Sequence, residues 1–228
     1  MPRRPFVRSA RLLAAAALVG LLCGDAAAGE KRKPVVTKLT VDPSAREVEL
    51  FEAIEEEELA VRMIPKDSKG GNLLIENKTD QPLTVKMPPG FVGVQVFKQI
   101  GGGLGGGGGQ QVGGGAGGLG GGGLGGGGLG GGGAGGGGFF SIPAETVARV
   151  PYTSVCLEHG KPEPSSRMTY EIRPVEEVTD DETLQALIAL VGSGKIDADV
   201  AQAAAWHLTD GMSWAQLAAL KNERLGGL

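Results

Sequence analysis

The chain contains few of the residues that most exported enzymes and metal proteins depend on. Its 228 residues include two cysteines, two histidines, two tryptophans and two tyrosines. Cys23 falls in a predicted leader, which leaves Cys156 alone and excludes a framework of disulfides. The sequence also has no Cys-x-x-Cys, no His-Glu-x-x-His and no Gly-x-Ser-x-Gly, so zinc peptidases and hydrolases with a nucleophile elbow are excluded. We therefore predict that the chain is not an enzyme and carries no cofactor.

Long apolar runs are also missing beyond the first 28 residues. Residues 1–28 carry four arginines, then the apolar stretch Leu12–Leu22, and end in three alanines. This order is typical of an export signal, and the apolar stretch is too short to span a bilayer comfortably. We predict cleavage after Ala28, with no transmembrane helix in the mature chain and a periplasmic, cell-surface or secreted location.

Two details of the leader leave its export route open. Adjacent Arg3 and Arg4 fit a twin-arginine signal as well as an ordinary basic segment. Cys23 follows Leu22, whereas a lipoprotein signal needs a small residue before its cysteine, so cleavage after Ala28 is favoured over lipidation.

Excess positive charge is absent as well. The whole chain has a formal charge of −4, and loss of the leader's four arginines and one aspartate makes it −7. A mildly acidic protein does not suit the phosphate backbone, so nucleic acid is excluded as a partner.

Glycine, in contrast, is abundant, with 42 residues, most of them within residues 101–138. This tract has few apolar side chains to bury, and ordering glycine costs much backbone entropy, which predicts a disordered loop. No Lys-Ser or Lys-Thr follows it, so it lacks a nucleotide-binding signature. Because loop closure costs little extra entropy per added residue, the tract can interrupt a folded domain.

Residues 33–100 and 139–178 show the alternation of short strands. Val92, Val94 and Val96 share one face before the glycine tract, and Asn77 to Pro82 suit a hairpin connection. Seven or eight short strands at regular spacing predict an antiparallel Ig-like β-sandwich.

Residues 179–225 change to a helical period. Thr179 and Glu182 form a capping box, Asp197 can cap a second helix, and Ser213 opens a third. The sequence thus predicts an α+β domain in which a small helical cap follows the sandwich.

Two short segments carry the chemistry that the rest of the chain lacks. The first, Cys156–Pro162, precedes Tyr170, and the second is Gln202-Ala-Ala-Ala-Trp206. Together they resemble the cysteine and Gln-x-Ala-x-Trp segments of bacterial surface thioester domains. The resemblance implies an internal thioester between Cys156 and Gln202, and a covalent adhesin that reacts with a host amine. The residues it implies in support are His159, Trp206, His207 and Tyr170.

A simpler interpretation makes Cys156 a buried strand cysteine, Trp206 a helix anchor and Gln202 a polar residue on a helix face. A third sees a copper or redox site built from Cys156, His159 and His207, with Met168 or Met212. We predict the simpler case. The chain is then a non-catalytic exported module with a structural or interaction role, whose partner is an envelope or extracellular protein or polymer.

Overall fold

The computed structural model describes residues 33–97, 109–116 and 138–226, which belong to one folded unit, Lys33–Leu228. The predicted leader, residues 1–28, lies outside the described residues. In the part that is described, no helix is both long enough and apolar enough to cross a bilayer.

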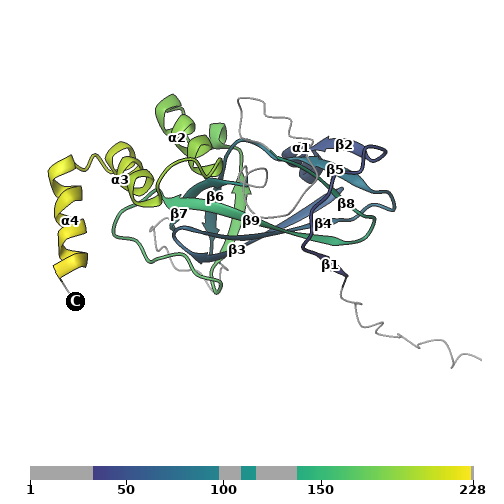
Figure 1. Cartoon of the computed structure of the whole chain (residues 1–228), viewed down its shortest axis with the longest axis horizontal. Coiled ribbons are helices and arrows are strands. Elements are labelled where there is room, and N and C mark those ends of the chain that lie inside the picture. The colour runs from purple at the N-terminus through teal and green to yellow at the C-terminus, as the bar shows by residue number, and fades with distance from the viewer. Residues whose placement is uncertain (1–32, 98–108, 117–137, 227–228) are drawn as a thin grey trace, which may run out of the picture. The chain divides into compact units, whose positions relative to one another are not determined.

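Ten strands and four α-helices make up the described chain (Figure 1). The strands are β1 (Val35–Val36), β2 (Arg46–Glu49), β3 (Leu59–Asp67), β4 (Gly70–Asn77), β5 (Leu83–Lys86), β6 (Phe91–Val96), β7 (Gln111–Gly115), β8 (Phe139–Ile142), β9 (Val147–Cys156) and β10 (Thr169–Arg173). The helices are α1 (Leu50–Glu55), α2 (Glu182–Gly192), α3 (Ala198–Thr209) and α4 (Trp214–Gly226), and the short 3₁₀ helix η2 (Val175–Glu177) precedes α2.

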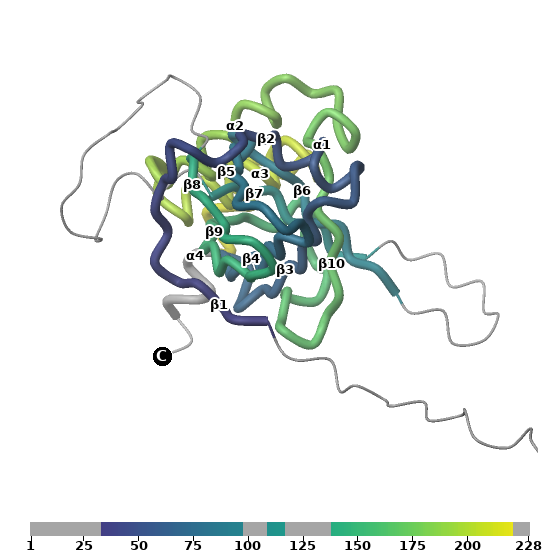
Figure 2. Tube along the Cα trace, turned by 90° about the vertical axis from the view of Figure 1, so that its right-hand side faces the viewer, coloured from purple at the N-terminus to yellow at the C-terminus, as the bar shows by residue number. Residues whose placement is uncertain are grey.

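Six of the strands close into a barrel in the order β9-β4-β3-β10-β6-β7, and β7 pairs back onto β9. All six neighbouring pairs are antiparallel. Figure 2 shows these strands following one another around a ring. The α+β class is therefore confirmed, but the Ig-like sandwich is wrong. Closure removes the open sheet edges that a sandwich would leave on these strands.

A smaller sheet, β2-β5-β8, lies beside the barrel, with β2 parallel to β5 and β5 antiparallel to β8. Helix α1 follows β2 directly and buries Leu50 and Ala53. Residues 46–55 thus form a strand and then a short helix within the predicted run of strands. Glu57, at φ 59°, ends the segment in the left-handed region before β3 begins.

The strand that closes the barrel comes from the glycine tract, so disorder across the whole of 101–138 is the wrong prediction for residues 111–115. The reason is packing. A side chain at Gly113 would lie 2.7 Å from Ile188 of α2, and one at Gly115 would lie 2.8 Å from the Cα atom of Gly192. Glycine in β7 lets the helix approach the barrel backbone, a gain that compositional arguments do not count.

Polar side chains cap the N-termini of α2, α3 and α4. Asp181, rather than the expected Thr179, caps α2 by accepting hydrogen bonds from the amides of Thr183 and Leu184. Asp197 caps α3 in the same way, as predicted. Ser213 opens α4 as predicted, and it forms a reciprocal pair of hydrogen bonds with Gln216.

Two apolar clusters hold the unit together. One lines the barrel interior and extends to α1 and the small sheet, with Leu73, Ile75 and Phe91 fully buried. The other lies between the outer barrel face and the helices, where Val155 and Leu157 meet α2 and α3. Residues 155–157 alternate between the two, so Cys156 belongs to the interior and its neighbours to the helical side.

Candidate functional site

The structure brings Cys156 and Gln202 into direct contact, although 46 positions separate them. The Gln202 side chain accepts a hydrogen bond from the Cys156 amide at 2.9 Å and donates one to its carbonyl at 2.8 Å. The carboxamide therefore mimics the edge of a neighbouring strand. It does so at the end of β9, where the Cys156 amide and carbonyl have no neighbouring strand of the described chain to bond to.

This gap arises because the C-terminal end of β9 extends beyond the N-terminal end of β4. The first residue of β4, Gly70, pairs with Thr153, and the Ser154 amide bonds to the carbonyl of Lys69. On the other side, the Leu157 amide bonds to Gln111 of the neighbouring strand β7. The Cys156 amide and carbonyl point the opposite way, past the end of β4. Left unpaired, such groups cost about 1–3 kcal/mol, and Gln202 removes that cost.

The thiol of Cys156 lies in the barrel interior and is only 5% exposed. Burial raises its pKa to about 11, opposed by a hydrogen bond from Gln110, with Glu163 and Glu158 adding to the rise. At neutral pH the group is thus a protonated thiol and a poor nucleophile. The thiol and the Gln202 carboxamide approach the strand from different directions, the first from the interior and the second along the sheet plane.

Tyr170 belongs to the same interior cluster as Cys156. It is 4% exposed, and its hydroxyl donates to the Met168 sulfur at 3.7 Å. Burial raises its pKa to about 12, with the nearby Cys156 and Glu158 contributing. Tyr170 and Cys156 therefore share the apolar interior of the barrel, and a supporting role for Tyr170 in thioester chemistry stays a prediction.

Gln110 is a site residue that the sequence reasoning missed. It is 2% exposed, lies directly before β7, and contacts the thiol of Cys156. Its backbone amide donates to the Gln95 side chain at 3.1 Å. The signal was available, since Gln110 and Gln111 are the polar interruption of the glycine tract, but their burial follows only from the closed barrel.

Both histidines pair with a tryptophan. The rings of His159 and Trp206 meet edge to face with centroids 4.7 Å apart, and those of His207 and Trp214 lie 4.4 Å apart and tilted by 31°. The His159 amide donates to Asp210, and Nδ1 of His207 contacts the carbonyl of Met212 at 2.7 Å. His207 therefore faces α4 rather than Cys156.

Trp206 differs from the buried anchor expected of it. It is half-buried, and its indole Nε1 is shielded without a partner among the described residues. The residues that seat α3 on the barrel are Ala201 and Ala205, at 1% and 0% exposure. Small side chains bring the helix close enough for Gln202 to reach the β9 backbone.

Metal ligands do not converge in the described part of the chain. There, no three histidine, cysteine, aspartate or glutamate side chains are grouped so that they could hold an ion. The rings of His159 and His207 contact Trp206 and Trp214, Nδ1 of His207 contacts the Met212 carbonyl, and the Met168 sulfur accepts from Tyr170.

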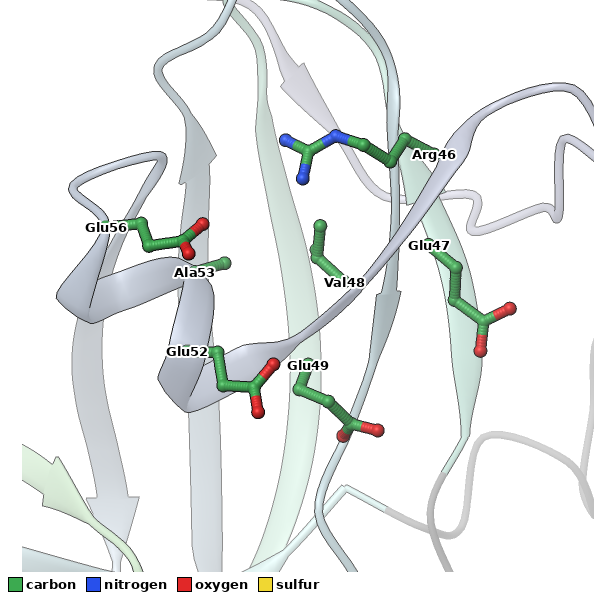
Figure 3. Close-up of a pocket in the computed structure, with 7 residues that line it drawn as sticks. All are labelled: Arg46, Glu47, Val48, Glu49, Glu52, Ala53 and Glu56. Carbon is green, nitrogen blue, oxygen red and sulfur yellow. The ribbon is translucent and has the colours of Figure 1, made fainter.

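Among the hollows on the surface of the described residues, two adjoin the segments discussed above. The smaller, about 340 Å³, lies between β2 and α1 and is lined by four glutamates, with Arg46, Val48 and Ala53 (Figure 3). Arg46 is paired with Glu58, and Glu49 with Lys86. The larger, about 480 Å³, lies where β7 and the end of β9 meet α2 and α3, next to the cysteine segment.

Comparison with known proteins adds no relative. No family model matches the chain, and neither a curated protein nor a solved structure is similar to it.

Proposed function

We propose that the chain is a non-catalytic exported module that binds a partner in the cell envelope or outside the cell. The observation that carries this is the exposed indole of Trp214. It is 57% exposed on α4, stacked on His207. Large aromatic side chains held rigidly at a surface are characteristic of interaction hot spots.

The remaining candidate groups support a structural rather than a catalytic role. The carbonyl oxygen and the amide nitrogen of the Gln202 side chain both hydrogen-bond to the β9 backbone. The Cys156 thiol is buried, which raises its pKa. Neither group is poised to react with a solute from water, because a thiolate is the reactive form and burial disfavours it.

The test compares two exposed aromatic residues of similar exposure. Trp214→Ala is expected to weaken binding of the purified protein to envelope material from its own organism by about 30-fold, as for a hot spot. Phe97→Ala, which removes a side chain 59% exposed at the end of β6, is the matched control and is expected to bind as wild type. Equal binding by both variants and wild type would remove Trp214 as the contact.

A second candidate, the thioester adhesin, is motivated by the proximity of the two residues, since Gln202 hydrogen-bonds to the backbone of Cys156. In that chemistry a bond forms from Sγ to Cδ of the carboxamide, the C–N bond breaks, and ammonia leaves with the thiol proton.

Intact mass separates the two candidates. A thioester lowers the mass by about 17 Da, and methylamine converts it to an N-methylamide of Gln202, which adds about 31 Da and frees the Cys156 thiol. For the binding module we expect the full mass and one thiol that reacts with a thiol reagent only after unfolding. A reproducible deficit that Cys156→Ala abolishes would establish the adhesin instead.

A further inference from the structure

The larger hollow, defined here as the α2–α3 cleft, combines an apolar floor with acidic walls. Leu157 and Leu184 are 3% and 6% exposed, and Val178 and Leu208 are partly buried. Three carboxylates lie among these side chains, those of Glu158, Asp181 and Asp210, together with Gln111, Thr179 and Thr209.

The carboxylates are held in place by the fold. Glu158 is paired with Lys161 and also accepts the amide of Gln111 at 3.0 Å. Asp181 is fixed as the cap of α2 through one of its oxygens. Asp210 accepts the His159 amide and the Thr209 hydroxyl, both through Oδ2. These bonds hold each carboxylate in one orientation.

Charge in the cleft is only partly compensated. Lys161 is the cation paired with Glu158, and Asp181 and Asp210 have no salt-bridge partner among the described residues. The second oxygen of each, Asp181 Oδ2 and Asp210 Oδ1, makes no hydrogen bond within the described chain. Both oxygens are therefore available to a cation from outside.

An apolar floor beside fixed carboxylates matches one kind of side chain. Lysine and arginine bury an aliphatic stem along apolar surface and keep a cationic head at its edge. A hydrogen bond from such a head to a carboxylate is stronger than one between neutral groups. The acidic balance of the chain, −4 overall, also attracts a basic partner over a distance.

We propose that the α2–α3 cleft binds a basic segment of a partner protein, with a lysine or arginine stem on Leu184 and Leu208 and its head at Asp181 and Asp210. This rests on the proposed function as a binding module, and it assigns that module a site and a class of partner.

The experiment uses the whole protein and a synthetic peptide of alternating lysine and leucine, with binding measured by titration calorimetry. Asp181→Asn together with Asp210→Asn is the test variant, because asparagine keeps the hydrogen-bond acceptors of the cap and of the His159 contact while removing both charges. Binding is expected to weaken at least about tenfold, and more at low salt than at high salt.

The matched control is a second double variant that removes two negative charges outside the cleft. Asp197→Asn keeps the cap of α3, and Asp80→Asn alters an exposed turn between β4 and β5; neither residue lines the cleft. This variant is expected to bind as wild type. A peptide of alternating glutamate and leucine is expected not to bind, and one of lysine and glycine to bind more weakly than the lysine–leucine peptide.

Equal losses in the two double variants would overturn the proposal, since general charge and not the cleft would then govern binding. No binding of the lysine–leucine peptide to wild type would overturn it as well. Neither result touches the Trp214 comparison on envelope material, so a failure of this site and a failure of the binding function can be told apart.

Discussion

At the scale of single residues, the most informative side chain is Gln202, because it replaces a missing strand. Its carboxamide offers one acceptor and one donor at the spacing of a peptide group, which suits the Cys156 amide and carbonyl together. The gap beyond the N-terminal end of β4 therefore explains a glutamine at this position, and no thioester chemistry is needed to account for it.

Removal of this side chain gives the first stability prediction. Gln202→Ala should lower the free energy of unfolding by about 1–3 kcal/mol, because it leaves two backbone groups unpaired. Gln185→Ala is the control, since that amide donates a single bond, to the Thr179 carbonyl at 2.8 Å, and should cost less. Urea denaturation measures both, and an equal or smaller loss for Gln202 would contradict the strand-edge role.

The buried thiol predicts a dependence of stability on pH. The pKa of Cys156 rises from 9.0 to about 11 on folding, so its contribution is fully present below pH 9 and is lost as pH rises toward 11. Tyr170 acts in the same direction. The difference in unfolding free energy between wild type and Cys156→Ala should therefore shrink over that window. A difference that stays constant from neutral pH to pH 11 would show that the thiol is not desolvated.

At the scale of elements, β7 is where sequence and structure differ most. The strand contains Val112 as its one large apolar residue, and it forms because β6 and β9 supply hydrogen bonds on both sides and α2 covers its outer face. These contacts come from residues distant in the sequence, so composition alone indicates disorder there.

Overpacking tests this account of β7. Gly113→Ala places a methyl group 2.7 Å from Cγ1 of Ile188, and should cost about 1–3 kcal/mol. In an Ile188→Ala background the clash is relieved, so the same change should cost less, with a coupling energy measured by a double-mutant cycle in urea. Additive effects would mean that the helix does not rest on this glycine.

The rest of the glycine tract should behave differently from β7. Deletion of ten residues from within 117–137 should leave stability unchanged or slightly raised, since closure entropy changes by about 0.6 kcal/mol per halving of a loop. Replacement of all of 101–138 by a short linker should instead destabilise the protein, because it removes β7 and with it barrel closure. Thermal melts of the two deletions separate these outcomes.

Some elements were predictable because their signals are local. The caps of α3 and α4 at Asp197 and Ser213 depend on neighbours a few residues away, and both are present. The inward face of α3 was not predictable in this way, since the larger apolar Val200 is 58% exposed while the neighbouring Ala201 is buried. Which stripe faces inward depends on how closely the helix packs, and that is set by β9.

At the scale of the whole molecule, the closed barrel explains why the candidate residues meet. Pairing of β7 with β9 places Gln110 beside the Cys156 thiol, and the end of β4 leaves the gap that Gln202 fills. The sequence could place Cys156 on a strand and Gln202 on a helix. It could not show that the two approach through the backbone, because strand alternation gives a face only once the sheet is known.

The helices contribute unequally to this assembly, which leads to the last prediction. Helix α2 packs on β7 and β9 through Leu187, Ile188 and Val191, whereas the described part of α4, which lies beyond α3, buries Leu217 alone (Figure 1). Truncation after Gly211 should therefore cost no more than about 2–3 kcal/mol, the burial of roughly one leucine with its neighbouring contacts.

Truncation before Asp181 should behave differently, because it strips the outer barrel face of its whole apolar cover and leaves Val92, Val155 and Leu157 in water. The first truncation should retain a cooperative urea transition with a nearly unchanged slope, and the second should lose it. Loss of cooperativity in the first would make α4 part of the folding unit. Trp214 would then be a packing residue, and its exposed indole could no longer be offered as the module's contact.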